Sequence, residues 1–225
     1  MIQNRLFNGV TGVSFKTVLS LIILHCSRFL KVSYIIGSSA ALFSVSSVVG
    51  PLVGVYGGVA TSVAVCAAGL LLRYTLFGIT SLHILAFYIP GLCAALYHAR
   101  PGILTRVALP AACMALFLLH PTGAQAYAYS FYWLLPIALY FIPQKNFFLD
   151  ALGSTFVAHA VGSVIWLYTL TMPAAVWWGL IPVVALERCV FACGMYLTHK
   201  VILFATSAIG KGAFARGVVR QRSAV

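Results

Sequence analysis

Two adjacent ionisable residues, Glu187 and Arg188, lie near the middle of a long apolar run, residues 174–199. An ionised side chain at the centre of a bilayer costs about 2.5–3.5 kcal/mol on insertion scales, so such groups face a bundle interior or a water-filled cavity. Consecutive helical residues point about 100° apart, so the two cannot both face one lipid-exposed side. The pair is predicted either to bind a substrate or proton, or to fix helix packing.

A second set of small and polar side chains lies in the preceding apolar run. Its members follow the spacing i, i+4, i+7, i+8 and i+11 and share one helix face. They are Thr155, His159, Gly162, Ser163 and Trp166. Small residues let a neighbouring helix approach closely, and His159 and Ser163 can hydrogen-bond across the contact. Thr155, His159, Ser163 and Trp166 therefore join Glu187 and Arg188 as candidate substrate-binding residues.

The two sets are predicted to meet across a helical hairpin. Pro173 separates the two runs, with His159 fourteen residues before it and Glu187 fourteen residues after it. In an antiparallel hairpin these residues lie at similar depth, which predicts a contact between His159 and Glu187. The alternative is ordinary helix packing with a satisfied polar pair.

The cysteines and histidines do not follow the spacing of a metal site. Cys189 and Cys193 share a helix face, but two ligands do not make a zinc site, and the sequence contains no CxxC, HxxxH or HExxH. A GxSxG nucleophile motif is also missing. We therefore expect no metal, no cofactor and no catalytic residue.

Three glycines, Gly50, Gly54 and Gly58, form two overlapping GxxxG motifs within the small-residue segment 37–60. Glycine at this spacing lets two membrane helices dock at short distance. The motif is predicted to pack within the chain or to dock a partner subunit.

Composition decides the protein class. The chain has 225 residues, of which 62% are hydrophobic and 7% charged, and its mean hydropathy is +1.04. A soluble domain is about 25% charged, so this chain cannot cover a globular surface with its few charges. An integral membrane protein that crosses the bilayer several times is predicted, with the lipid bilayer as its surroundings.

The fold is predicted to be an all-α transmembrane bundle of about six spans, with seven as the alternative. The apolar runs are 32–49, 52–72, 74–97, 103–119, 129–143, 147–172 and 174–199. Gly50-Pro51 could be a kink within one helix, and His120-Pro121-Thr122-Gly123 is a turn signal. Basic residues near both ends favour cytoplasmic termini, and this placement requires an even number of spans.

Three segments follow from this pattern. Residues 1–31 form a short basic amphipathic N-terminal segment, residues 32–200 form the bundle, and residues 201–225 form a basic cytoplasmic tail. The net charge is +12, but the basic residues are strung between apolar runs. This distribution indicates basic residues beside membrane spans, which set the orientation of the protein in a cell inner or plasma membrane, rather than nucleic-acid binding.

The stretch G-S-S-A-A-L-F-S at 37–44, followed by G-P-L-V-G-V-Y-G-G at 50–58, resembles the early helices of a known family. These are the substrate-binding membrane subunits of energy-coupling-factor (ECF) type vitamin transporters. The resemblance concerns the layout of residues 32–200. It implies a roughly six-span fold that binds a small molecule, docks a coupling subunit and works with a separate ATPase.

The preferred function is a transport component that binds a small-molecule substrate within the bundle. The first alternative is a non-catalytic membrane scaffold or assembly protein whose buried charges fix packing only. The second is a membrane-embedded enzyme, which the chain's two carboxylates make the weakest of the three.

Overall fold

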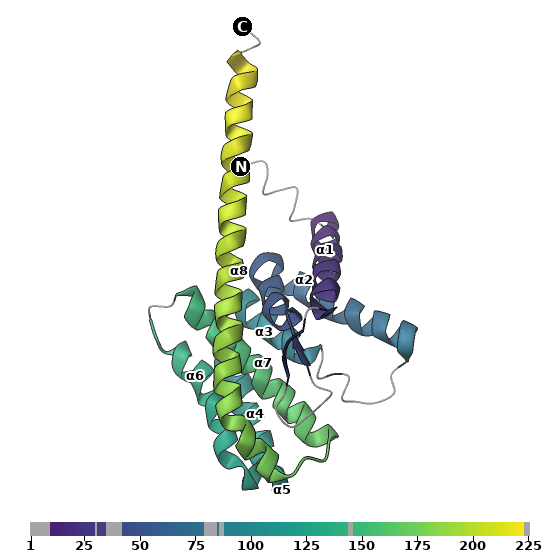
Figure 1. Ribbon diagram of the computed structural model, residues 1–225, viewed down its shortest axis with the longest axis vertical. Coiled ribbons are helices and arrows are strands. Elements are labelled where there is room, and N and C mark those ends of the chain that lie inside the picture. Colours follow the sequence, from purple (N-terminus) through teal and green to yellow (C-terminus); the bar gives the residue numbers. More distant parts are fainter. Residues whose placement is uncertain are drawn as a thin grey trace.

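The protein is described by a computed structural model that covers residues 10–29, 31–34, 42–78, 85, 88–143 and 146–222. Almost every element is a helix (Figure 1). In chain order the elements are α1 (Val10–Phe29), β1 (Lys31–Tyr34), β2 (Leu42–Ser44), α2 (Ser46–Phe77), α3 (Ile89–Ala99), η2 (Leu104–Ala108), α4 (Leu109–Leu119), α5 (Pro121–Gln125), η3 (Tyr127–Trp133), α6 (Leu134–Tyr140), α7 (Phe147–Thr169) and α8 (Ala174–Arg222). The prediction of a helical bundle is confirmed, with one antiparallel ribbon of two short strands added.

Three helices in the described part of the chain are long and apolar enough to cross a bilayer. They are Ser46–Leu76, Phe147–Thr169 and Ala174–Ser207. Shorter apolar helices cover Thr17–Ser27, Ile89–Ala99 and Leu104–Leu119. These helices indicate a membrane protein, whereas the count of six spans stays a prediction.

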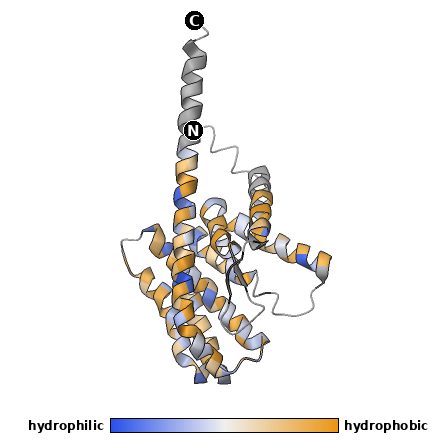
Figure 2. Ribbon diagram, in the orientation of Figure 1, coloured by the Kyte–Doolittle hydropathy of each residue, from blue (hydrophilic) through white to orange (hydrophobic). Residues whose placement is uncertain are grey.

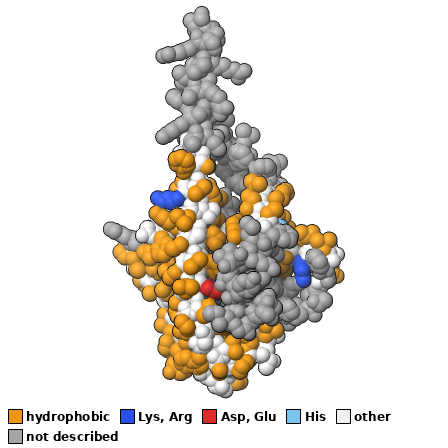
Figure 3. Space-filling model, in the orientation of Figure 1, with side chains coloured by type: hydrophobic (Ala, Val, Ile, Leu, Met, Phe, Trp, Pro, Cys, Tyr) orange, Lys and Arg blue, Asp and Glu red, His pale blue; other side chains and the backbone are white. Residues whose placement is uncertain are grey.

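The surface carries large exposed apolar side chains where a water-soluble protein would carry charge. Figure 3 shows hydrophobic side chains over most of the described face, with Lys and Arg in small isolated patches. Leu119 and Phe204 are each more than 70% exposed. Such a surface suits lipid, because hydrocarbon neighbours replace the missing protein contacts.

The helix α8 dominates the shape of the molecule. It is 49 residues long, about 73 Å at 1.5 Å per residue, and its C-terminal part projects beyond the other helices (Figure 1). Figure 2 shows mostly hydrophobic residues along the part of α8 that lies beside the other helices. The predicted boundary at residue 200 falls inside this continuous helix.

The helix ends follow from local sequence. Asn146 caps α7 by accepting a hydrogen bond from the backbone N–H of Leu149 at 2.9 Å. Pro121 keeps His120 out of the helical region, so α4 ends at Leu119, and a short helix, α5, begins at Pro121 where the sequence predicts a turn. Gly50 and Pro51 lie within α2, and the interruption of that helix falls at Gly58, whose φ is 73°.

The segment η3–α6 is longer than the same number of residues would be in an α-helix. The seven residues of η3 form a 3₁₀ helix, which rises about 2.0 Å per residue instead of 1.5 Å. With the seven residues of α6, this segment extends about 24 Å, close to the length of a 16-residue α-helix. It packs against α7, whose other neighbours are α3, η2, α4 and α8.

Candidate functional site

The predicted substrate-binding residues come together where α7, α8 and η3 pack. Thr155, Ser163, Glu187 and Arg188 are all buried, each at most 7% exposed, and His159 is half-buried. The structure therefore confirms that these polar groups lie inside the bundle rather than on its lipid-facing surface.

His159 is the centre of a hydrogen-bonded network, which we call the His159 network. Its members are Tyr129, Trp133, His159 and Ser163. The hydroxyl of Tyr129 lies 2.7 Å from Nε2 of His159 and 3.2 Å from Oγ of Ser163. The indole N–H of Trp133 donates to Nδ1 of His159 at 3.2 Å.

These contacts define the form of the imidazole. An indole N–H can only donate, so Nδ1 of His159 must accept and cannot carry a proton. The ring is then neutral, with its proton on Nε2, where it donates to Tyr129. The hydroxyls of Tyr129 and Ser163 hydrogen-bond with each other, and the network forms a chain from η3 to α7.

Aromatic rings enclose this network on the side of α4 and α8. The ring of Trp177 lies 5.0 Å from that of Tyr129 and 5.2 Å from that of Phe117, both edge-on. Trp133 and Phe117 are 0% exposed and Trp177 is 1% exposed. Edge-to-face rings at these distances pack favourably, so this side of the site is closed by a tight aromatic core.

Glu187 and Arg188 extend the site along α8. Nη2 of Arg188 lies 3.6 Å from Oε2 of Glu187, and Nη1 donates to the backbone carbonyl of Thr155 at 3.5 Å. The guanidinium also lies over the ring of Phe191, 4.7 Å from its centroid. Arg188 thus links α8 to α7 through a charge buried in the bundle.

The predicted register of the α7–α8 hairpin is close to the observed one, but the predicted pair is wrong. Among the described residues, the hydrogen bonds of His159 go to Tyr129, Trp133 and Ser163 rather than to Glu187. The next residue, Arg188, makes the contact with α7, one helical turn from His159 at Thr155. The longer arginine side chain reaches the partner helix, and the rings of η3 occupy both nitrogens of His159.

The remaining residues of the α7 stripe face other neighbours. Trp166 is half-buried and packs against the aromatic core. Gly162 faces Pro90 of α3, with ordinary van der Waals space for a Cβ atom. One helix stripe is therefore shared among η3, α8, the aromatic core and α3.

The docking glycines of α2 make contacts within the chain. A Cβ atom on Gly54 would overlap the backbone carbonyl of Ala95, so α2 and α3 meet backbone to backbone there. Gly50 faces Leu24 of α1 at an ordinary distance of 3.7 Å. Gly58 has open space around it and supplies the positive φ of the kink. Residues 37–41, the first part of the small-residue segment, lie outside the described residues.

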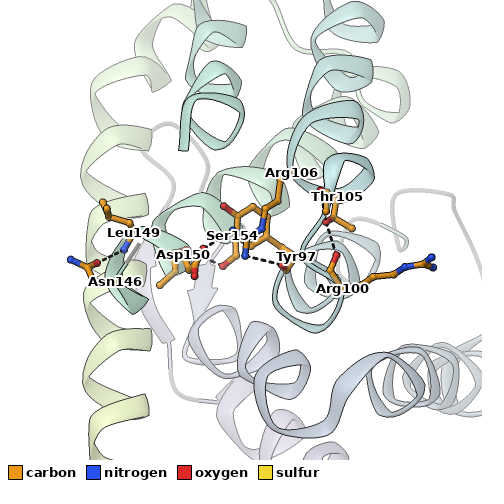
Figure 4. A network of polar contacts seen from close by, with 10 residues as sticks. Tyr97, Arg100, Thr105, Arg106, Asn146, Leu149, Asp150 and Ser154 are labelled. Carbon is orange, nitrogen blue, oxygen red and sulfur yellow. Dashed lines mark hydrogen bonds and ion pairs between the residues drawn. The ribbon is translucent and has the colours of Figure 1, made fainter. Parts of the chain in front are cut away.

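Sequence reasoning missed a second ion pair, between the buried Arg106 of η2 and the half-buried Asp150 of α7. Nη1 of Arg106 lies 2.8 Å from Oδ1 of Asp150 (Figure 4). Two signals were present in the sequence: Arg106 interrupts an apolar run, and Asp150 is one of only two acidic residues. Both acidic residues of the chain are thus paired with an arginine.

The described residues contain no group of three or more His, Cys, Asp or Glu side chains that could hold a metal ion. Cys189 and Cys193 are exposed on α8. The polar chemistry of the described bundle lies in the His159 network, the Glu187–Arg188 pair and the Arg106–Asp150 pair.

Comparison of the chain with protein families, curated proteins and solved structures gives no match.

Proposed function

We propose that this membrane protein is a transport component that binds a small molecule between α7 and α8, beside Thr155, His159, Ser163, Trp166, Glu187 and Arg188. The burial of Glu187 at 7% exposure and Arg188 at 5% exposure, near the middle of the apolar helix α8, is the observation that carries this proposal. Ionisable groups at this depth are costly, and in membrane proteins they mark substrate and ion pathways.

The arrangement of the site supports a ligand with both polar and aromatic character. Arg188 supplies a cation, Glu187 an anion, and the rings of Tyr129 and Trp177 an apolar wall. Binding sites for small molecules combine an apolar lining with a few fixed polar groups in this way. A ligand would enter between α7 and α8, because the aromatic core closes the opposite side.

The ECF resemblance implies a coupling subunit and a separate ATPase as partners. Gly54 is occupied by α3, so it supports internal packing rather than docking. The second half of α2 offers an exposed apolar face in its place. Its exposed large side chains are Val59, Val63, Leu71, Leu72, Tyr74 and Leu76.

A scaffold function is the second candidate, and the His159 network favours it. Both ring nitrogens of His159 have partners inside the chain, so the ring is engaged before any ligand arrives. In a scaffold, these hydrogen bonds and the Glu187–Arg188 pair would fix how η3, α7 and α8 pack, with no further role.

Ligand-dependent stabilisation of the purified protein separates the two functions. The parent, Glu187→Gln and His159→Gln are melted in detergent with a panel of vitamins and other small molecules, and His25→Gln on α1 is the control. Transport predicts that at least one compound raises the melting temperature of the parent and of His25→Gln but not of the two site variants. A scaffold predicts that no compound acts on the parent and that both site variants accumulate poorly.

A further inference from the structure

A second polar cluster lies at the end of the bundle away from the α4–α5 turn. It consists of Tyr97 and His98 from α3, Arg106 from η2 and Asp150 from the first turn of α7, and we call it the Arg106 cluster (Figure 4). None of these residues belongs to the His159 network or to the proposed substrate site.

The charge of Arg106 is buried and has one carboxylate beside it. The residue is 6% exposed and lies on a single π-helical turn, a feature common at functional sites. Its Nη1 pairs with Oδ1 of Asp150 at 2.8 Å, and its Nη2 donates to the backbone carbonyl of Tyr97 at 3.4 Å. The guanidinium carbon stands 4.2 Å from the ring centroid of Tyr97. This is a one-point pairing, and it leaves part of the guanidinium fork unused.

The cluster contains four buried polar atoms without a hydrogen-bond partner among the described residues, and two of them, Nε2 of His98 and Oδ1 of Asp150, are able to accept. Nε of Arg106 and the hydroxyl of Tyr97 are buried, and neither has a hydrogen-bond partner among the described residues. Tyr97 is 0% exposed, and its hydroxyl packs against Gly153, where a Cβ atom would overlap it. A buried donor without an acceptor costs about 1–3 kcal/mol, so two of them beside one cation call for an acceptor.

The neighbouring histidine adds no charge of its own at neutral pH. Burial, helped by the positive charges of Arg106 and His199, lowers the pKa of His98 to about 4. Arg106 is then the cation that dominates the electrostatic potential of the cluster. Its counterion, Asp150, is accessible, with 26% of its side chain exposed. Asp150 can move toward solvent and leave the guanidinium to another anion.

We propose that the Arg106 cluster is a binding site for a small oxyanion, a carboxylate or phosphate group, whose oxygens replace Asp150 on Arg106. The incoming oxygens accept hydrogen bonds from Nη1 and Nε of Arg106 and from the hydroxyl of Tyr97. The guanidinium fork matches the spacing of two such oxygens. Asp150 acts as the internal counterion that holds the site when no ligand is bound.

The test measures the melting temperature of the detergent-purified full chain while chloride is replaced by formate or inorganic phosphate at constant ionic strength. Both anions should raise the melting temperature of the parent and of Arg100→Gln, which changes an exposed arginine nearby. The anion concentration that gives half of this rise should be the same for the two proteins. Asp150→Asn removes the competing carboxylate, so the anion concentration that gives half of the stabilisation should fall at least tenfold in this variant. Arg106→Gln should abolish the response, and Arg106→Lys should weaken it because lysine lacks the fork.

Tyr97→Phe covers the case in which charge variants fail to fold. It keeps the ring under Arg106 and removes the unpaired hydroxyl, so without anion the variant should be at least as stable as the parent. The anion concentration that gives half of the stabilisation should rise several-fold. A purely structural ion pair predicts that formate, phosphate and phosphatidic acid all leave both the parent and Asp150→Asn unchanged, and this result would overturn the proposal.

A second arm identifies the source of the oxyanion. Phosphatidic acid is titrated into delipidated protein in place of inorganic phosphate, with phosphatidylcholine as the zwitterionic control. Stabilisation by formate and phosphate indicates a soluble anion, whereas stabilisation by phosphatidic acid alone indicates a lipid headgroup. If neither acts, the site does not exist.

Discussion

The hydroxyl of Tyr129 lies 2.7 Å from Nε2 of His159, so a hydrogen bond inside the bundle joins the 3₁₀ helix η3 to α7. Its direction is settled by Trp133, which donates to the other ring nitrogen and makes Nε2 the donor. Tyr129 therefore accepts from His159, and its hydroxyl also hydrogen-bonds with that of Ser163 at 3.2 Å.

Removing the hydroxyl of Tyr129 should destabilise the protein. In Tyr129→Phe, Nε2–H of His159 and the hydroxyl of Ser163 keep only their longer contact with each other, at 3.4 Å, and a buried group left poorly satisfied costs up to about 1–3 kcal/mol. The melting temperature in detergent should drop clearly. Tyr127→Phe is the matched control, because Tyr127 lies in the same 3₁₀ helix and is 51% exposed. Equal melting temperatures of the two variants would contradict the network.

Gly54→Ala should weaken the contact between α2 and α3. The added methyl group overlaps the carbonyl of Ala95, which belongs to the backbone and cannot rotate away. Overpacking of this kind costs about 1–3 kcal/mol, and the protein should accumulate less and melt earlier. Gly91→Ala on α3 is the control, since its Cβ would meet open space and alanine favours a helix. A Gly54→Ala variant as stable as the control would show that the two helices do not meet at this glycine.

The protein should lose more stability when one charge of the Glu187–Arg188 pair is removed than when both are removed. Glu187→Gln leaves the buried guanidinium without its carboxylate, which costs about 3–5 kcal/mol in comparable buried pairs. A double variant, Glu187→Met with Arg188→Met, removes both charges and should recover much of that loss. Chemical or thermal melting of the parent and the two variants tests this expectation, and a double variant that is less stable than Glu187→Gln would argue against an interacting pair.

Acid should destabilise the end of the bundle that contains His98. Its pKa is lowered from 6.5 to about 4, so the folded protein keeps the ring neutral while the unfolded chain takes up a proton below pH 6.5. Stability is therefore lost as the pH falls from 6.5 toward 4, by about 2 kcal/mol at pH 5. Melting curves at pH 7.5 and 5 should show this loss for the parent and His25→Gln, and a smaller loss for His98→Gln.

The sequence allowed the helical membrane class and the α7–α8 hairpin to be predicted, because hydrophobicity and Pro173 determine both locally. It did not predict the partners of His159. These come from η3, thirty residues upstream, and the 3₁₀ geometry that turns Tyr129 inward leaves no periodic signal. Arg106 was missed for a similar reason, since a π-helical turn shifts the face on which a residue lies.

The direction of the bundle in the membrane can be tested with two introduced cysteines. The turn at 120–126 and the loop at 170–173 contain no Lys or Arg, whereas Arg100 and Lys200 lie toward the opposite end. Because basic loops stay in the cytoplasm, the α5 end should face outward.

In a cysteine-free background, Gln125→Cys and Pro143→Cys place exposed thiols before η3 and after α6. An impermeant maleimide applied to intact cells should label Gln125→Cys, and it should label Pro143→Cys only after permeabilisation. The opposite pattern would mean an inverted orientation. Equal labelling of both thiols in intact cells would show that η3–α6 does not cross the bilayer, despite the extra length that its 3₁₀ turn provides.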